Sequence, residues 1–224
     1  MCDGGGSMLI LSIDTCGPAG SVALARLEDD TLALLGQAGL PGKSYSAQLM
    51  PSIRDLLAAH ANSATDLSGI VVTSGPGSFT GIRIGLSTAK GLAEVASIPL
   101  VAVSRLAVLA HKSGAAAAAL DASRGEFYFG EYPGGQGCES LLSREFFQSA
   151  AGVLGPKLAV CDDPGHKTAP AATFIPAPTA EDALRFALTR LRSGDFDDPV
   201  TLDGNYLRRS DAEIFARPRL VPQP

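Results

Sequence analysis

The chain has 224 residues, of which 46% are hydrophobic, and a formal net charge of −5. This length allows one large domain or two small ones, no stretch is apolar enough over 20 residues to cross a membrane, and the acidic balance argues against an autonomous nucleic-acid-binding protein. The four cysteines form no CxxC pair and no Cys/His cluster, which is typical of free thiols in a reducing cytoplasm.

The N-terminal segment begins with MCDGGGS, which has no positive region and no long apolar run. It therefore predicts a flexible leader over residues 1–7, with Met8 as an alternative start, and not a secretion signal. Short apolar runs bounded by turn residues then predict strands at 9–13, 21–26 and 32–37. A helix is expected at 45–60, where Leu49, Ile53 and Leu57 recur at helical spacing and Ser44 precedes as a cap.

The most informative segment is IVVTSGPGSFTGIRIG at residues 70–85. It predicts a buried strand at 70–73, a glycine-rich turn, and a helix at 81–95 that Thr80 would cap. The turn matches neither a P-loop nor the dinucleotide fingerprint, because no Gly-Lys-Ser/Thr follows and Thr80 stands where the third glycine would be. Two interpretations stay open: a loop that holds an anion, or one that lets the helix pack closely on a neighbour.

The second half is expected to contain a strand at 100–103, a helix at 105–111 and a hairpin of 117–121 against 126–132. A helix at 144–151, a strand at 158–161 and a helix at 180–192 follow. Residues 134–137 and 170–178 are predicted loops, and the acidic pairs at 162–163 and 195–198 are predicted solvated turns. The arginines Arg208, Arg209, Arg217 and Arg219 suggest a basic tail, which is solvated or contacts tRNA.

As a whole string, residues 70–85 resemble the GxGPGSFTGxRxG motif of the TsaB (YeaZ) family, which takes part in making threonylcarbamoyladenosine on tRNA. The family belongs to the actin, Hsp70 and hexokinase-like superfamily. Three further segments resemble family elements in the same order: LILSIDTCGPAGSVALA at 9–25, DASRGEFYFGEY at 121–132 and NYLRR at 205–209. The resemblance implies an α/β fold of two ribonuclease-H-like lobes. The first lobe would cover residues 8–104, and a reduced second lobe with the basic tail would cover 105–224.

The resemblance also implies a function. The chain would be a non-catalytic subunit that binds and activates a TsaD-like transferase, recruits a TsaE-like ATPase, and meets tRNA only within that complex. It would need no cofactor of its own, would be cytoplasmic, and could form a homodimer when isolated. The alternative is an enzyme of the same superfamily, either an ATP-dependent phosphotransferase or a peptidase.

Two helices would form the partner-binding surface by this resemblance. The small side chains Gly81, Gly85 and Ala89 lie on one helical face and would admit a close neighbour, although such a face is more often internal core. The candidate partner-binding residues are Tyr45, Leu49, Met50, Ile53, Leu57, Gly81, Ile82, Gly85, Leu86, Ala89 and Leu92.

A weaker expectation concerns nucleotide binding at Asp14, Thr15, Gly75 and Gly77. Superfamily members hold Mg²⁺ and phosphates beside such an aspartate, but a turn cap is the commoner role. The related TsaD family holds a metal with a His-x-x-x-His motif, and its two positions align here with Arg105 and Leu109. Neither side chain can ligate a metal, and no catalytic or metal-binding residue is therefore expected.

Overall fold

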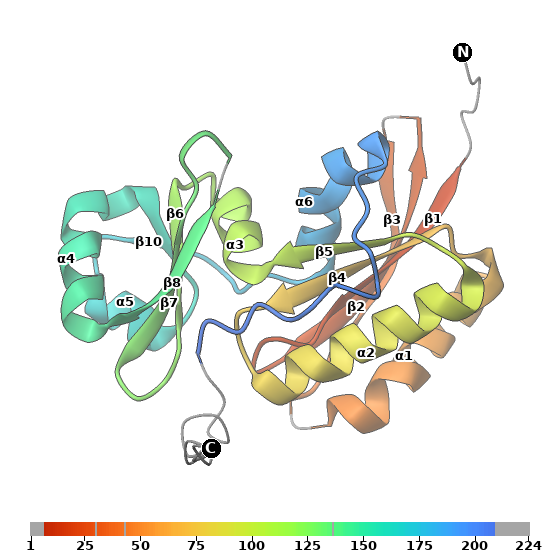
Figure 1. The fold of residues 1–224 in the computed structure, drawn as a ribbon, viewed down its shortest axis with the longest axis horizontal. Helices are drawn as coiled ribbons and strands as arrows, with labels where there is room; N and C mark the ends of the chain where they lie inside the picture. The colour runs from red at the N-terminus through yellow and green to blue at the C-terminus, as the bar shows by residue number, and fades with distance from the viewer. Residues whose placement is uncertain (1–6, 30, 43, 136, 209–224) are drawn as a thin grey trace, which may run out of the picture.

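The computed structural model describes residues 7–29, 31–42, 44–135 and 137–208. Nearly all of the expected leader, and Arg209, Arg217 and Arg219 of the expected tail, lie outside the described residues. Two five-stranded sheets lie side by side (Figure 1). Among the described residues, no helix combines the length and the apolar character needed to span a bilayer.

The first sheet has the strand order β3-β2-β1-β4-β5. Its first three strands are antiparallel, and β4 and β5 add in parallel beside β1. The strands are β1 (Met8–Asp14), β2 (Gly20–Glu28), β3 (Thr31–Leu40), β4 (Gly69–Gly75) and β5 (Leu100–Ser104). Strand β4 is buried along its whole length, as expected for a strand covered on both faces.

The second sheet repeats this arrangement. Its order is β10-β9-β6-β7-β8, with three antiparallel strands followed by two parallel ones beside the first. The strands are β6 (Ala117–Asp121), β7 (Glu126–Glu131), β8 (Cys138–Ser143), β9 (Leu158–Val160) and β10 (Thr173–Phe174). The last two strands have only three and two residues. The expected pair of ribonuclease-H-like lobes, the second reduced, is therefore confirmed.

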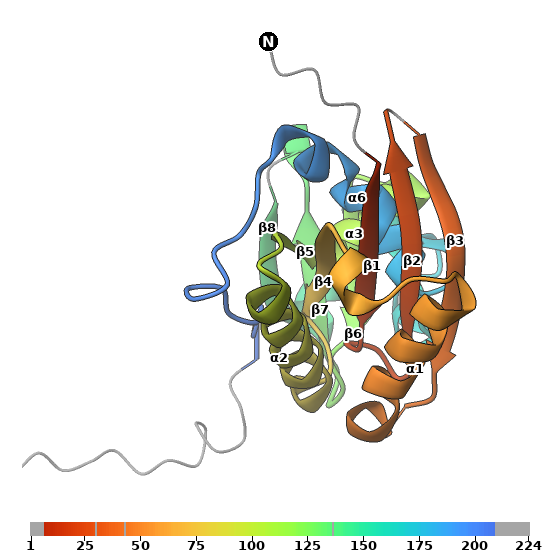
Figure 2. The same ribbon diagram turned by 90° about the vertical axis from the view of Figure 1, so that its right-hand side faces the viewer.

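Helices cover both faces of the first sheet. On one face, α1 (Tyr45–Ala59) and α2 (Phe79–Ala96) lie side by side, and α6 (Ala180–Ser193) covers the other (Figures 1 and 2). The side chains of Ala183 and Leu184 in α6 join a buried cluster with Ile10 and Val71 of the sheet. The division of the chain after residue 104 stays a prediction, but this packing assigns α6 to the first sheet, although its residues follow the second sheet in sequence.

Helix α3 (Arg105–Ser113) lies between the two sheets. Its Val108 belongs to the cluster beneath α6, whereas Leu106 and Leu109 pack against the second sheet. The other face of the second sheet is covered by α4 (Arg144–Leu154) and the short α5 (Asp163–Thr168). Phe147 of α4 stacks on Phe127 of β7 with 4.2 Å between ring centroids.

Several local features differ from the sequence-based expectations. Strands β8 and β10, helix α5 and two single-turn 3₁₀ helices, at Ala64–Asp66 and Gly155–Lys157, were not expected. Asp162 lies in no solvated turn: its Oδ1 accepts a hydrogen bond from Gly165 N at 2.7 Å and caps α5. Helix α2 begins at Phe79, and its cap is Ser78, not Thr80, because the Ser78 hydroxyl accepts from Gly81 N at 3.2 Å.

Residues 197–208, which we call the strap, connect the two sheets after α6. The strap runs along α2 and ends beside the second sheet (Figures 1 and 2). Asp197 accepts a hydrogen bond from Ala102 N of β5 at 2.6 Å. Further along, Asn205 N donates to Ser74 O at 2.8 Å and Asn205 Nδ2 donates to Glu139 of β8. The strap therefore joins both lobes.

Candidate functional site

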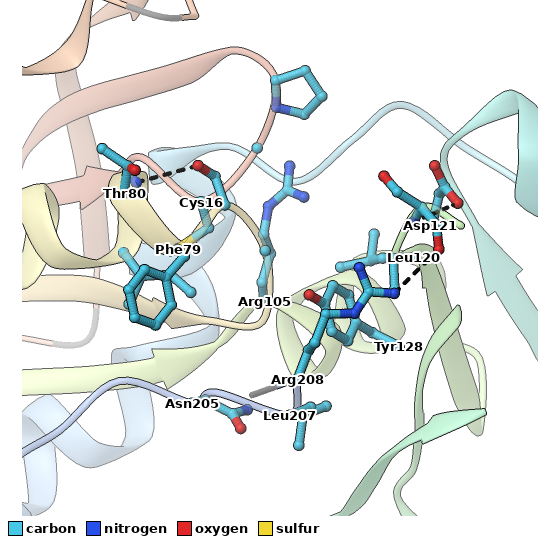
Figure 3. A pocket seen from close by; sticks show the side chains of 18 of the residues that line it. Cys16, Phe79, Thr80, Arg105, Leu120, Asp121, Tyr128, Asn205, Leu207 and Arg208 are labelled. Atoms are coloured by element: carbon cyan, nitrogen blue, oxygen red, sulfur yellow. Dashed lines mark hydrogen bonds between the residues drawn. The ribbon is translucent and has the colours of Figure 1, made fainter. Parts of the chain in front are cut away.

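A cleft of about 1120 Å³ opens between the two lobes. Its walls come from the β1–β2 turn, the first turns of α2 and α3, the β6–β7 turn and the end of the strap. Figure 3 shows Arg105 in the middle, with Cys16 and Phe79 on one side and Leu120, Tyr128 and Arg208 on the other. A cleft of this size is large enough for an organic ligand.

The β1–β2 turn is held by Asp14, which is 1% exposed. Its Oδ1 accepts a hydrogen bond from Cys16 N at 2.9 Å, the turn-capping arrangement that competed with a metal-binding role. Thr15 is also fully engaged, because its hydroxyl donates to Gly81 O at 2.7 Å. Tyr45 supports the turn from outside by donating from Oη to Gly17 O at 2.7 Å.

The glycine-rich loop packs directly on this turn. A Cβ at Gly77 would lie 2.2 Å from Cys16 O, and Ser78 N donates to the same oxygen at 2.8 Å. At Gly75 a Cβ would lie 2.9 Å from Asn205 O of the strap, and both glycines have positive φ. Of the two interpretations of this loop, the contacts support close approach of one backbone to another.

The second carboxylate oxygen of Asp14 faces Arg105. Arg105 Nε lies 3.4 Å from Asp14 Oδ2, and the two side chains are only 6% and 2% exposed. Burial by itself would lower the pKa of Arg105, but the charge of Asp14 raises it above its ordinary value, so the guanidinium remains protonated. The same burial raises the pKa of the nearby Cys16 thiol, with a further contribution from Asp14.

These residues do not fit a metal ion. A cation beside Asp14 would meet the fixed positive charge of Arg105, and Leu109, the other aligned position, is buried in the core. Among the described residues, no group of three His, Cys, Asp or Glu side chains is placed to hold a metal. Two of the three histidines pack on aromatic rings: His111 on Phe186, with 5.4 Å between ring centroids, and His166 on Phe174, with 4.9 Å.

The side chains of the expected partner-binding stripe are mostly buried within this chain, and their contact with a partner stays a prediction. A Cβ at Gly81 would lie 2.0 Å from Thr15 O, and one at Gly85 would lie 2.4 Å from Thr15 Oγ1. The close neighbour that the small residues admit is therefore the β1–β2 turn. The residues of the expected set that this core buries are Tyr45, Leu49, Ile53, Leu57, Gly81, Ile82, Gly85, Leu86 and Ala89.

Other positions on α1 and α2 face solvent. Met50 is 49% exposed, and Leu92 is partly buried at the edge of the core. Val95, one residue before the end of α2, is 88% exposed and was not among the expected residues. Val95 lies on a different face of α2 from the buried stripe. This could be predicted from the sequence, because Val95 falls outside the i, i+4 series of Gly81, Gly85 and Ala89.

The strap brings Asn205 and Arg208 to the cleft, and sequence reasoning did not identify the partners of these two residues. Glu139 of β8 accepts hydrogen bonds from Ser104, from Tyr132 Oη at 2.7 Å and from Asn205 of the strap. Arg208 pairs with Glu126 and also donates to Ser123 O at 3.1 Å. The NYLRR segment resembles a family element, which marked this region as a candidate. A local sequence pattern does not predict which residues, so far away in the sequence, form its hydrogen bonds and ion pairs.

Comparison with known families matches residues 40–187 to the family described as TsaD: tRNA N6-adenosine threonylcarbamoyltransferase. The tRNA threonylcarbamoyladenosine biosynthesis protein TsaB of Escherichia coli (strain K12) is 40% identical over 131 residues, or 56% of this chain. That match spans about half of the relative, 55% of its length. An uncharacterized protein of Mycobacterium tuberculosis (strain H37Rv) is 30% identical over 212 residues, covering 92% of this chain and 95% of its own.

Solved structures show the same architecture. A crystal structure from Pseudomonas aeruginosa, described as an uncharacterized protein with similarity to peptidase YEAZ, superposes with a TM-score of 0.71. It is 26% identical and covers 90% of this chain and 100% of its own. The structure described as YeaZ from the same organism has a TM-score of 0.69 at 24% identity, with 89% and 100% covered. At that identity the second likeness supports the fold alone.

Proposed function

Because this chain belongs to the TsaB (YeaZ) family, we propose that it is a non-catalytic subunit of the assembly that makes threonylcarbamoyladenosine in tRNA. In this proposal it binds a TsaD-like transferase and makes that enzyme competent, and the assembly recruits a TsaE-like ATPase. The transfer reaction and the contact with tRNA belong to the assembly. In isolation, the same surface would allow the chain to pair with itself.

The arrangement at Asp14 is the observation that carries the non-catalytic part of the proposal. Its carboxylate is occupied by Arg105 and by a backbone N–H, so it is not available to hold a metal ion or to act as a base. A cationic arginine cannot act as a general base or ligate a metal. The buried Cys16 is no better as a nucleophile, because its raised pKa keeps it as a thiol.

The solvent face of α1 and α2 is the surface that we propose for the partner. These two helices contact each other on one face of the first sheet, whereas α6 covers the opposite face (Figure 2). Met50 and Val95 expose apolar side chains there, and Leu92 of α2 is partly buried at the edge of the core. Apolar side chains on neighbouring helices are suited to helix-in-groove or helix–helix recognition.

The test is a pull-down of the TsaD-like transferase of the same organism by wild-type protein and by the variants Met50→Lys and Val95→Lys. The matched control is Val153→Lys on α4. Val153 is 86% exposed against 88% for Val95, and each is the last residue but one of its helix. A lysine near a helix C-terminus is favourable, so Val95→Lys and Val153→Lys should not impair folding, and Met50 is 49% exposed, so a lysine there can reach solvent.

We expect Val95→Lys and Met50→Lys to weaken binding while Val153→Lys binds like wild type, since a charge in a closely packed interface is costly. Undiminished binding by the first two variants would place the interface elsewhere. Absence of binding by the wild-type protein would contradict the subunit proposal itself.

A further inference from the structure

The guanidinium of Arg105 has only one of its ends satisfied. Its Nε faces Asp14, and neither terminal nitrogen has a hydrogen-bond partner among the described residues. In the described part of the chain, Ser12 Oγ is the one side-chain atom that is both fully buried and without a partner. The unpaired terminal nitrogens of Arg105 are therefore not fully buried, and Arg105 lines the cleft. The residue as a whole is 5% exposed.

Unused guanidinium donors at the wall of a cleft indicate a ligand that accepts two hydrogen bonds. A buried cation with unmatched N–H groups has a large desolvation cost, and its planar fork matches the paired oxygens of a phosphate or a carboxylate. The side chain is also held in place: Asp14 fixes Nε, and the guanidinium lies over Gly17, where a Cβ would be 2.5 Å from Nη2.

The other charged groups around the cleft also favour an anionic ligand. The first turn of the 18-residue helix α2 lines the same cleft and directs its positive end there. The charged residues at the walls are three arginines, Arg105, Arg124 and Arg208, and two aspartates, Asp121 and Asp162. Asp162 accepts backbone N–H groups on both oxygens and Asp121 on one, so their charges are partly satisfied.

We propose that this cleft binds an anionic organic ligand through a phosphate or carboxylate group held by Arg105, without a metal ion. Arg105, beside Asp14, would itself supply the positive charge that faces the ligand. A volume of about 1120 Å³ accommodates a ligand of the size of a nucleotide. The proposal does not rest on the partner-binding function, because Met50 and Val95, which carry the proposed partner face, do not line the cleft.

The experiment measures binding of pyrophosphate, ADP and citrate to the full chain by calorimetry and by thermal shift, in excess EDTA and again with Mg²⁺. The variant is the double change Asp14→Asn with Arg105→Gln, which removes both charges together and leaves no uncompensated buried ion. The control is Arg54→Gln, an exposed arginine on α1 that pairs with its neighbour Asp55.

We expect at least one probe to bind in EDTA no more weakly than with Mg²⁺, and its Kd to rise by at least about tenfold in the double variant but not in Arg54→Gln. Binding of pyrophosphate and ADP would identify the phosphate, and binding of citrate alone the carboxylate. Three results would overturn the proposal: no probe binds, binding requires Mg²⁺, or the double variant binds as the wild type does.

Should the double variant fail to fold, the wild-type protein still decides the matter. The side-chain Nε–H resonance of Arg105 should shift in an NMR titration with the bound probe. An unchanged Arg105 resonance at saturation would place the ligand elsewhere and overturn the proposal.

Discussion

Thr15 and Gly81 are locked together by two contacts: the Thr15 hydroxyl donates to Gly81 O at 2.7 Å, and a Cβ at Gly81 would lie 2.0 Å from Thr15 O. The end of the first strand and the start of α2 therefore touch backbone to backbone. This contact explains the glycine in the SFTG sequence more directly than phosphate binding does, and it places the β1–β2 turn at the mouth of the cleft.

The first prediction tests this contact. Gly81→Ala should lower the free energy of unfolding by about 3 kcal/mol, because a methyl group cannot be accommodated against a backbone oxygen. Gly91→Ala in the same helix is the control, because a Cβ added at Gly91 meets no atom within 4 Å. This substitution should stabilise the protein by about 1 kcal/mol, since alanine has the higher helix propensity. Urea unfolding of both variants measures the difference, and equal stabilities would contradict the packing described here.

A second prediction concerns the buried ion pair. Arg105→Met should destabilise the fold by roughly 3–5 kcal/mol, because it leaves the carboxylate of Asp14 buried without its cation. Adding Asp14→Asn to that variant should recover part of the loss, since no charge then remains. A double-mutant cycle from chemical denaturation gives the coupling energy. Additive effects of the two changes would show that the pair does not interact.

The strap gives a third prediction. Glu139→Ala removes the acceptor for Ser104, Tyr132 and Asn205, and should cost about 3 kcal/mol, because hydrogen bonds to a charged group are the stronger kind. Hydrogen exchange of residues 197–208 should accelerate as the strap loses its attachment to the second sheet. Glu131→Ala, an exposed position on the neighbouring strand β7, should leave both quantities unchanged.

The fourth prediction uses the thiol of Cys161. Burial raises the pKa of this thiol from 9.0 to about 11. At pH 8 only about 0.1% would be thiolate, so alkylation followed by site-resolved mass spectrometry should label the exposed Cys138 well before Cys161. Comparable rates at the two sites would contradict the partial burial of Cys161 and the raised pKa of its thiol.

The same shift predicts a pH dependence of stability. Between pH 9 and 11 the unfolded chain has lost the Cys161 proton while the folded chain retains it. The contribution of this group is therefore present below pH 9 and is lost as the pH rises towards 11. The difference in unfolding free energy between wild type and Cys161→Ala, measured across this interval, should fall with pH. A flat difference would show that the thiol titrates alike in both states.

Much of the fold follows from local pattern. The strands of the first sheet are short apolar runs between turn residues, and α1 and α2 carry apolar residues at helical spacing, so their type and order could be predicted. Strand β8, with the sequence CESLLS, has no clear alternation and forms because β7 offers an unpaired edge. Helix α5 contains Pro164 and Gly165 and depends on the Asp162 cap. Such elements are determined by their neighbours.

The site was predictable in composition but not in orientation. The sequence marks Gly81, Gly85 and Ala89 as a face that admits a close neighbour, yet periodicity does not say whether that neighbour is this chain or another. In the structure, the neighbour of Gly81 and Gly85 is Thr15 of the same chain. Likewise, the arginine at position 105 could be recognised as unable to ligate a metal, whereas its pairing with Asp14, 91 residues away, depends on tertiary packing.

The placement of α6 has a consequence during synthesis on the ribosome. One face of the first sheet, including Ile10, Val71 and Val101, is covered mainly by α6, whose last residue is Ser193, and α3 adds only Val108 to this buried cluster. After β5 has emerged, roughly 90 more residues must be translated, which takes about 5 to 18 s at typical rates. The nascent first lobe therefore carries an uncovered apolar face throughout this interval, and a chaperone that shields such faces would act on it before α6 arrives.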